Sequence, residues 1–221
     1  MYSGLLSFLE AGGFFVYPII FLSVLTVWFG LERMFALKSK NTLEKQDDVY
    51  KLAGSGKLEG AQALCATVSS PFTRIAAVIF QAYEKEHRAH STAQIRSILK
   101  IRAEEQGRQE VAKLEANLLP ISLTASTAPM MGLMGTVWGM ILTFEAINEV
   151  GMGSISGLAG GISQALITTL LGLSVGIPAL WLYRWLIKKV DEQTLELESA
   201  VLDLVDVLVE LSESNQEPEE S

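Results

Sequence analysis

The chain alternates between long apolar stretches and stretches that carry its charges. Three stretches contain no Asp, Glu, Lys, Arg or His: residues 11–31, 116–144 and 150–183. A helix needs about 20 residues to cross the hydrocarbon core of a bilayer, and a helix in a soluble core rarely runs this far without a charge. The pattern therefore predicts an all-α integral membrane protein with three transmembrane helices.

The charged stretch between the first two apolar stretches reads as a series of helices. Capping residues and glycines place these helices from Thr42 to about Gly54, from about Lys57 to Thr67, from Ser70 to about His87, and from Ser91 onward. No stop signal follows Ser91. We therefore expect the fourth helix to continue without a break into the second transmembrane helix.

The third apolar stretch is also expected to extend as a helix. After Lys189, apolar positions alternate in steps of four and three, at Val190, Thr194, Leu197, Val201, Leu204, Leu208 and Leu211. From Asp191 onward the chain has eleven acids and no base, so parallel copies packed only on each other would repel. We expect this segment to pack against the preceding base-bearing helix, which holds Arg96, Lys100, Arg102, Arg108 and Lys113.

The charges suggest an orientation in the membrane. Mean hydropathy is +0.32 and the net charge is -8, but every Lys and Arg lies within 33–113 or 184–189. By the positive-inside rule, the N-terminus is expected outside and the C-terminus inside. The expected order is an N-terminal interfacial segment (1–13), transmembrane helix 1 (14–33), a cytoplasmic helical domain (34–117), transmembrane helix 2 (118–147), a short periplasmic loop (148–157), transmembrane helix 3 (158–186), an amphipathic acidic helix (187–213) and a disordered tail (214–221).

Polar side chains occur inside the second and third spans. Thr136 and Thr143 are seven residues apart and share a face, as do Gln164 and Thr168, while Thr169 lies about 100° round from Thr168. Hydroxyl and amide groups in a membrane need a partner, a water molecule or an ion. Hydrogen bonds between helices and an ion pathway both meet that need, and the spacing leaves both readings open.

Small residues are dense in the same two spans. Glycines four residues apart allow close contact between helices. We expect this role for Gly132, Gly135, Gly139, Gly172 and Gly176.

Other chemistry is not indicated. No ionisable group lies inside any span, so an ion carrier would have to come from another protein. His87 and His90 lack the neighbours of a metal site, no nucleophile pairs with a base, and the single Cys65 permits no disulfide within the chain. We therefore expect no catalytic residue, metal or cofactor and no enzyme activity. The basic residues are mixed with acids, which argues against nucleic-acid binding.

Two stretches resemble a known family. APMMGLMGTVWGMILTF (128–144) and GGISQALITTLLGLSVGIPALWLY (160–183) resemble the MotA/TolQ/ExbB family, closest to its ExbB and TolQ branch. The resemblance implies a multi-pass subunit of a bacterial inner-membrane motor. It also implies a homo-pentamer around two single-span helices of an ExbD/TolR-like partner, whose membrane aspartate carries the coupling ion, with movement passed to a TonB-like or TolA-like protein.

The resemblance also implies roles for individual residues. Thr136 matches the threonine of the GTVWG motif, and Thr169 matches the threonine before the LGL-like stretch; both are expected to face the pore. Thr143, Thr168 and Gln164 complete the expected ion pathway. ExbB and TolQ proteins commonly have a glutamate where this chain has Gln164, and glutamine cannot take up and release a proton.

Two alternatives stay open at this point. The coupling ion is H+, passing by water to the partner's aspartate, or Na+ held by hydroxyl, amide and carbonyl oxygens. The rival to a motor is a non-conducting helical membrane scaffold, in which the polar residues only join helices.

Overall fold

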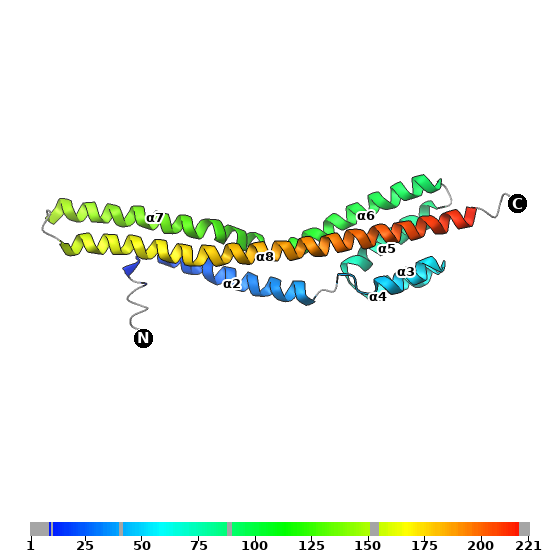
Figure 1. Ribbon diagram of the computed structural model, residues 1–221, viewed down its shortest axis with the longest axis horizontal. Coiled ribbons are helices and arrows are strands. Elements are labelled where there is room, and N and C mark those ends of the chain that lie inside the picture. Colours follow the sequence, from blue (N-terminus) through cyan, green and yellow to red (C-terminus); the bar gives the residue numbers. More distant parts are fainter. Residues whose placement is uncertain (1–8, 10, 40–41, 88–89, 151–154, 217–221) are drawn as a thin grey trace. The chain divides into compact units, whose positions relative to one another are not determined.

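The computed structural model describes residues 9, 11–39, 42–87, 90–150 and 155–216, and these residues form helices and turns without a β-strand (Figure 1). The chain divides into two compact units. The apolar unit comprises Met1–Phe35 and Asn117–Ile187, and the charged unit comprises Ala36–Ala116 and Lys188–Ser221.

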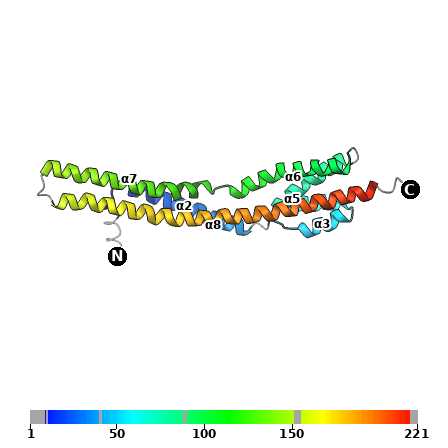
Figure 2. The same ribbon diagram turned by 45° about the horizontal axis from the view of Figure 1, so that its top comes forward.

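The apolar unit contains three helices, which are α2 (Val16–Ser39), α7 (Leu119–Val150) and the first part of α8 (Ile155–Gln216). All three are long and apolar enough to cross a membrane, which confirms the expected all-α membrane fold. In this unit α7 and α8 run side by side in both views (Figures 1 and 2). Helix α2 also packs on α8, because the backbone of Gly30 lies against the side chain of Leu182.

The charged unit contains α3 (Gln46–Gly54), α4 (Leu58–Thr67), α5 (Pro71–Glu86), α6 (Thr92–Glu115) and the C-terminal part of α8. Their buried side chains form one core, with Phe72, Phe80, Leu99 and Leu204 among its members. This unit is therefore a helical bundle built around large apolar residues.

Local signals explain how α5 begins. The Ser70 hydroxyl accepts a hydrogen bond from the Thr73 backbone N–H at 3.2 Å, and the Thr73 hydroxyl accepts one from the Ser70 N–H at 3.0 Å. Pro71 occupies the first helical position, where a missing N–H costs nothing. This start is the one that the sequence predicted.

The expected cap at Thr42 is wrong. Helix α3 begins later, at Gln46, and its N-cap is Lys45, which has a left-handed backbone (φ 66°) and no capping side-chain bond. The Thr42 carbonyl instead accepts a hydrogen bond from the Phe72 N–H at 3.2 Å. The segment before α3 is thus held by α5 and does not extend the helix.

The expected continuous helix from Ser91 into the second span is also wrong. Helix α6 ends at Glu115, Asn117 takes a left-handed conformation (φ 61°), and α7 begins at Leu119. Pro120 lies in the first turn of α7, where its missing N–H is tolerated, whereas inside a continuous helix it would remove a backbone hydrogen bond and its ring would clash with the carbonyl of residue 116. The break therefore has a local cause in the sequence.

Helix α8 is unbroken from Ile155 to Gln216, which confirms that the third span extends as a helix. It includes residues 214–216, which begin the segment expected to be disordered. The expected seam is buried at Val190, Leu197, Val201, Leu204 and Leu208. All of these except Val190 share a core with Ile95, Leu99 and Ala103 of α6, so the expected packing of the acidic segment against the base-bearing helix is confirmed.

Electrostatic pairing between these two helices is more limited than their packing. Arg96 of α6 pairs with Asp206 of α8 at 3.0 Å. Arg102 and Lys113 instead pair with Glu105 and Glu110 of their own helix. The apolar seam, more than the charges, therefore joins α8 to α6.

Parts of the expected order fall outside the described residues. These are residues 1–8 and 10 of the N-terminal interfacial segment, residues 151–154 of the short loop, and residues 217–221 of the tail. Helices α2, α7 and α8 each extend beyond the expected transmembrane bounds.

Candidate functional site

Helices α7 and α8 approach each other closely enough for their backbones to touch. A Cβ atom placed on Gly139 would lie 2.6 Å from the carbonyl oxygen of Gly161, and one on Gly172 would lie 2.6 Å from the carbonyl oxygen of Ala128. Real Cβ atoms essentially never come that close to another atom. Glycine is therefore required at both positions for the two helices to pack at this distance.

The other glycines expected at a helix contact lie along the same line. A Cβ on Gly132 would lie 3.0 Å from the Thr168 carbonyl oxygen, and one on Gly176 would lie 2.7 Å from Cδ of Pro129. Gly135 faces the side chain of Thr168. All five glycines named from the sequence are therefore located at the α7–α8 contact.

Two of the expected ion-pathway threonines are enclosed in this contact. Thr143 and Thr168 are buried. The Thr143 hydroxyl donates to the Gly139 carbonyl at 2.9 Å, and the Thr168 hydroxyl donates to the Ala165 carbonyl at 2.9 Å. Both hydroxyls therefore have partners in their own helix and are covered by the neighbouring one.

The other two threonines lie at the edge of the contact and are half-exposed. The Thr136 hydroxyl donates to the Leu133 carbonyl at 2.6 Å, while the Thr169 hydroxyl makes only a long bond of 3.4 Å to the Gly132 carbonyl. Thr136 is one helical turn beyond Gly132. The fold thus brings Thr136 and Thr169 near the same point of the α7–α8 pair, with hydroxyls that can turn to a further partner.

Gln164 has a neighbour that sequence reasoning missed. Its half-buried side chain lies against the backbone of Gly13, where an added Cβ would lie 2.9 Å from the carboxamide carbon. Gly13 has a left-handed conformation (φ 71°), which glycine adopts without strain. The pair of glycines just before the first span was the available signal, but nothing local identified Gln164 as its partner.

Ionisable side chains lie toward the ends of the described spans. Arg33, which is 8% exposed, donates to both oxygens of Glu32, from Nε at 2.9 Å and from Nη2 at 2.8 Å. Asn117 Nδ2 also donates to Glu32, at 3.1 Å. The described residues contain no group of three or more His, Cys, Asp or Glu side chains that could hold a metal ion. The site therefore offers hydroxyl, amide and carbonyl oxygens, but no side chain that changes charge in mid-span.

Outside the spans, burial raises the pKa of Cys65 and of Tyr50. Burial raises the pKa of the Cys65 thiol to about 11, so the thiol stays protonated and unreactive at neutral pH. Burial also raises the pKa of Tyr50, to about 12, and the Tyr50 hydroxyl donates to the Ala200 carbonyl of α8. Both groups have structural roles in the charged unit.

Comparison with known proteins places this site in a family. The model of the MotA/TolQ/ExbB proton channel family matches residues 69–199, a stretch that includes every site residue predicted above. The chain is 42% identical over 87 residues to the biopolymer transport protein ExbB of Aquifex aeolicus, covering 39% of this chain and 59% of that protein. It is 31% identical over 142 residues to ExbB of Neisseria gonorrhoeae, covering 62% and 64%.

A TolQ protein is also similar. The Tol-Pal system protein TolQ of Pseudomonas aeruginosa is 41% identical over 75 residues, which cover 34% of this chain and 32% of that protein. The chain thus spans less than two thirds of the length of each of these relatives. The family match covers more than half of this chain and includes both glycine-packed helices. The chain therefore belongs to the MotA/TolQ/ExbB proton channel family, as a membrane protein of its ExbB/TolQ-like branch.

Proposed function

We propose that this chain is the channel-forming subunit of an ion-driven motor in the bacterial inner membrane. Five copies surround the single-span helices of an ExbD/TolR-like partner, and the complex energises a TonB-like or TolA-like protein for outer-membrane transport or envelope maintenance. The N-terminus lies outside and the C-terminus inside. The observation that carries the proposal is the pair of half-exposed hydroxyls, Thr136 and Thr169, at one edge of a glycine-packed helix pair.

The partner supplies the ionisable group that the spans lack. A carboxylate on the partner helix receives hydrogen bonds from Thr136 and Thr169 while it is charged. Protonation removes the charge, which lowers the cost of moving the partner helix past the apolar wall. One elementary charge that crosses 100 mV releases about 2.3 kcal/mol, which is enough to bias a step of several RT.

The packing of α7 on α8 supports a wall that keeps its shape during this motion. The two helices touch through backbone atoms at Gly139, Gly161 and Gly172, so few side-chain rotations are available to deform the contact. Gln164 stays neutral and does not relay protons. It helps to hold the turn at Gly13 against α8.

The proposal is tested by proton flux in proteoliposomes that contain this chain and its ExbD/TolR-like partner. Thr136→Val and Thr169→Val are expected to lower flux by at least about tenfold, because each removes a hydrogen-bond donor that the developing charge needs. Thr127→Val is the matched control. Its hydroxyl also donates to its own helix, at 2.7 Å to Leu123, and nine residues place it about 180° from Thr136. Wild-type flux in both test variants would remove the threonines from the mechanism.

The coupling ion is proposed to be H+. The Na+ alternative would need several oxygens that an ion can reach, but the Thr168 hydroxyl is buried in the helix contact. Flux is expected to follow the pH gradient and to be the same with sodium or choline outside. Flux that requires sodium would replace the proton version with the sodium-driven one.

A non-conducting scaffold is the second candidate function, and it is favoured by the burial of Thr143 and Thr168 within the helix contact. In that case the polar residues only join α7 to α8. The scaffold predicts no ion flux from wild-type protein with any partner present. The same proteoliposome assay therefore separates the two functions.

A further inference from the structure

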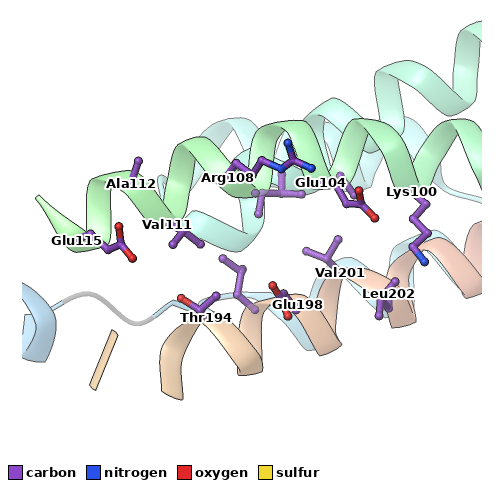
Figure 3. Close-up of a pocket in the computed structure, with 14 residues that line it drawn as sticks. Lys100, Glu104, Arg108, Val111, Ala112, Glu115, Thr194, Glu198, Val201 and Leu202 are labelled. Atoms are coloured by element: carbon purple, nitrogen blue, oxygen red, sulfur yellow. The ribbon is translucent and has the colours of Figure 1, made fainter. Parts of the chain in front are cut away.

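A groove of about 570 Å³ runs between α6 and the C-terminal part of α8 in the charged unit (Figure 3). Its floor is apolar and consists mainly of Ala103, Val111, Leu197 and Val201. Gly107 also lines it, and a Cβ atom added there would meet nothing within 4 Å. The groove therefore has room for side chains that this chain does not itself supply.

Large apolar side chains are exposed on the two helices that form this groove. Ile101 is 55% exposed, Leu195 67% and Leu202 47%, and they are the exposed large hydrophobic residues in the described part of the charged unit. Leu202 lines the groove, and Leu195 lies on the same face of α8, seven residues earlier. Removing apolar surface from water gains roughly 25 cal/mol per Å², so a helical bundle in water normally buries such residues. Their exposure indicates an interaction surface.

The charges beside the groove differ between its two sides. The α6 side carries the bases Lys100 and Arg108 among its acids, while the α8 side carries Glu198 within a segment that has no base after Lys189. Two α8 sides placed together would therefore set acids against acids. An α6 side placed against an α8 side brings bases to acids, as the Arg96–Asp206 ion pair already does within one chain.

We propose that this groove is the contact between two copies of the chain, in which the α6 side of one copy packs on the α8 side of the next. Ile101 of one copy then covers Leu202 of its neighbour, and Lys100 and Arg108 lie near the neighbour's acids. Such a contact joins two different surfaces, so it repeats from copy to copy, and it forms the proposed ring when the rotation between copies closes. The inference rests on the proposed homo-oligomeric motor and assigns the surface that assembles it.

The register within the charged unit indicates which residues meet. Helices α6 and α8 run antiparallel, and Arg96 lies level with Asp206. Ile101, five residues further along α6, is therefore level with residues 201–202 of α8. Copies related by rotation about an axis parallel to α6 and α8 keep these levels. Ile101 and Leu202 are thus the pair to test across the contact.

Cross-linking between differently tagged copies tests the contact directly. One tagged full-length chain carries Ile101→Cys and a second, with another tag, carries Leu202→Cys; both are expressed together with the partner protein, and membranes are treated with a flexible bis-maleimide. A product with both tags forms only between copies. Native Cys65 stays in place because it is buried, and chains without an added cysteine measure its background.

The control pair is Gln109→Cys with Asp203→Cys. Ile101 is seven residues from Arg108, which lines the groove, so it lies on that side of α6. Gln109 and Asp203 are exposed, and each is nine residues from a lining residue, Lys100 and Thr194, which places it about 180° away on its helix. The proposal expects at least about tenfold more doubly tagged product from the groove pair than from the control pair. Equal yields from the two pairs would overturn it, and so would a groove pair that cross-links only to another protein.

A second variant separates loss of assembly from loss of folding. Leu195→Asp changes an exposed position, so thermal unfolding of the charged unit is expected to stay the same while the native mass of the extracted complex falls. An unchanged native mass would overturn the proposal. Neither readout depends on ion flux. A cross-linked ring without flux therefore counts against the proposed function alone, whereas flux without the cross-link counts against the groove alone.

Discussion

The helices inside each unit of this protein pack in different ways. In the apolar unit glycines make the contact between α7 and α8, and many large side chains point outward, with Met130 and Trp181 at 66% and 74% exposed. In the charged unit the large residues are inside, and Phe72 and Phe80 are buried. The single helix α8 takes part in both arrangements.

The surroundings of each unit explain the difference. Lipid tails are as apolar as leucine, so burying a leucine between membrane helices gains little, and close backbone packing at small residues holds the helices together. In water, removal of large apolar surface from solvent is the main driving force. A large apolar side chain is therefore expected to stabilise the charged unit more than the apolar unit. Substitutions in the two units can measure this contrast.

The largest effect is expected for Phe72→Ala compared with Phe144→Ala. Phe72 is buried in the charged unit, whereas Phe144 of α7 is 59% exposed. Loss of the buried ring leaves a cavity and is expected to cost about 3–5 kcal/mol, while loss of the exposed ring is expected to cost little. Thermal unfolding in detergent, followed by circular dichroism, measures both. Equal destabilisation would show that the two units are packed alike.

The next effect concerns a buried carboxylate in the charged unit. Glu110 is 1% exposed and receives hydrogen bonds from Arg74 Nε at 2.8 Å and Lys113 Nζ at 2.7 Å. Arg74→Ala removes one partner and is expected to destabilise by about 2–3 kcal/mol, near the lower bound for buried pairs because Arg74 is partly exposed. Arg102→Ala is the control, since its pair with Glu105 is exposed on both sides and is expected to contribute less than about 1 kcal/mol.

The effect of Arg74→Ala is also expected to depend on pH. The pKa of Glu110 lies below its ordinary value of 4.5. Burial by itself would raise this pKa, but the hydrogen bonds and charges of Arg74 and Lys113 outweigh burial. The stabilisation is therefore present above that ordinary value and is lost as pH falls through the lower, folded-state pKa. Melting curves from pH 7 downward are expected to show the gap between wild type and Arg74→Ala closing only below about pH 4.5. A gap that does not change with pH would exclude the charge as its cause.

The third test compares two adjacent glycines of α8. An alanine Cβ at Gly161 would lie 2.6 Å from the Gly139 carbonyl oxygen, whereas one at Gly160 would meet nothing within 4 Å. Gly161→Ala is expected to cost about 1–3 kcal/mol by overpacking. Gly160→Ala is expected to be neutral or slightly stabilising, because alanine favours helix more than glycine does. If both variants melted alike, close backbone contact would not be what holds α7 to α8.

The smallest effect is expected at the charged surface. The Arg96–Asp206 pair is exposed on both sides, so Arg96→Glu is expected to cost less than about 1 kcal/mol, and less still in high salt. The double variant with Asp206→Arg should recover the loss. Thermal stability that is unchanged at low salt would show that the apolar seam alone joins α6 to α8.

Much of the fold could be predicted because its causes are local. The charge-free runs were long enough to identify three spans, and the four-three spacing after Lys189 identified the residues that α8 buries. The break before α7 also has local causes in the sequence, namely Pro120 and Asn117, because asparagine is one of the few residue types that readily adopt the left-handed conformation found at position 117. It was missed because the flanking residues otherwise favour a continuous helix.

The candidate site could be predicted only in part. Thr136 and Thr143 share a face by spacing, yet Thr143 is buried and Thr136 half-exposed, because burial depends on what lies opposite on α8. Gly161 lies against Thr143. Gln164 meets Gly13 across about 150 residues of chain, and no periodicity in either segment indicates the other.

The sequence by itself determined the class of protein, the number of spans, the absence of a charge in them and the small residues that let two helices meet. These properties follow from composition and from spacing along one helix. The tertiary structure alone decided which threonines are enclosed and which stay available, what Gln164 touches, and that the α6–α8 face has an open groove. Each of these depends on how one helix is rotated against another, which is set by packing between segments far apart in the chain.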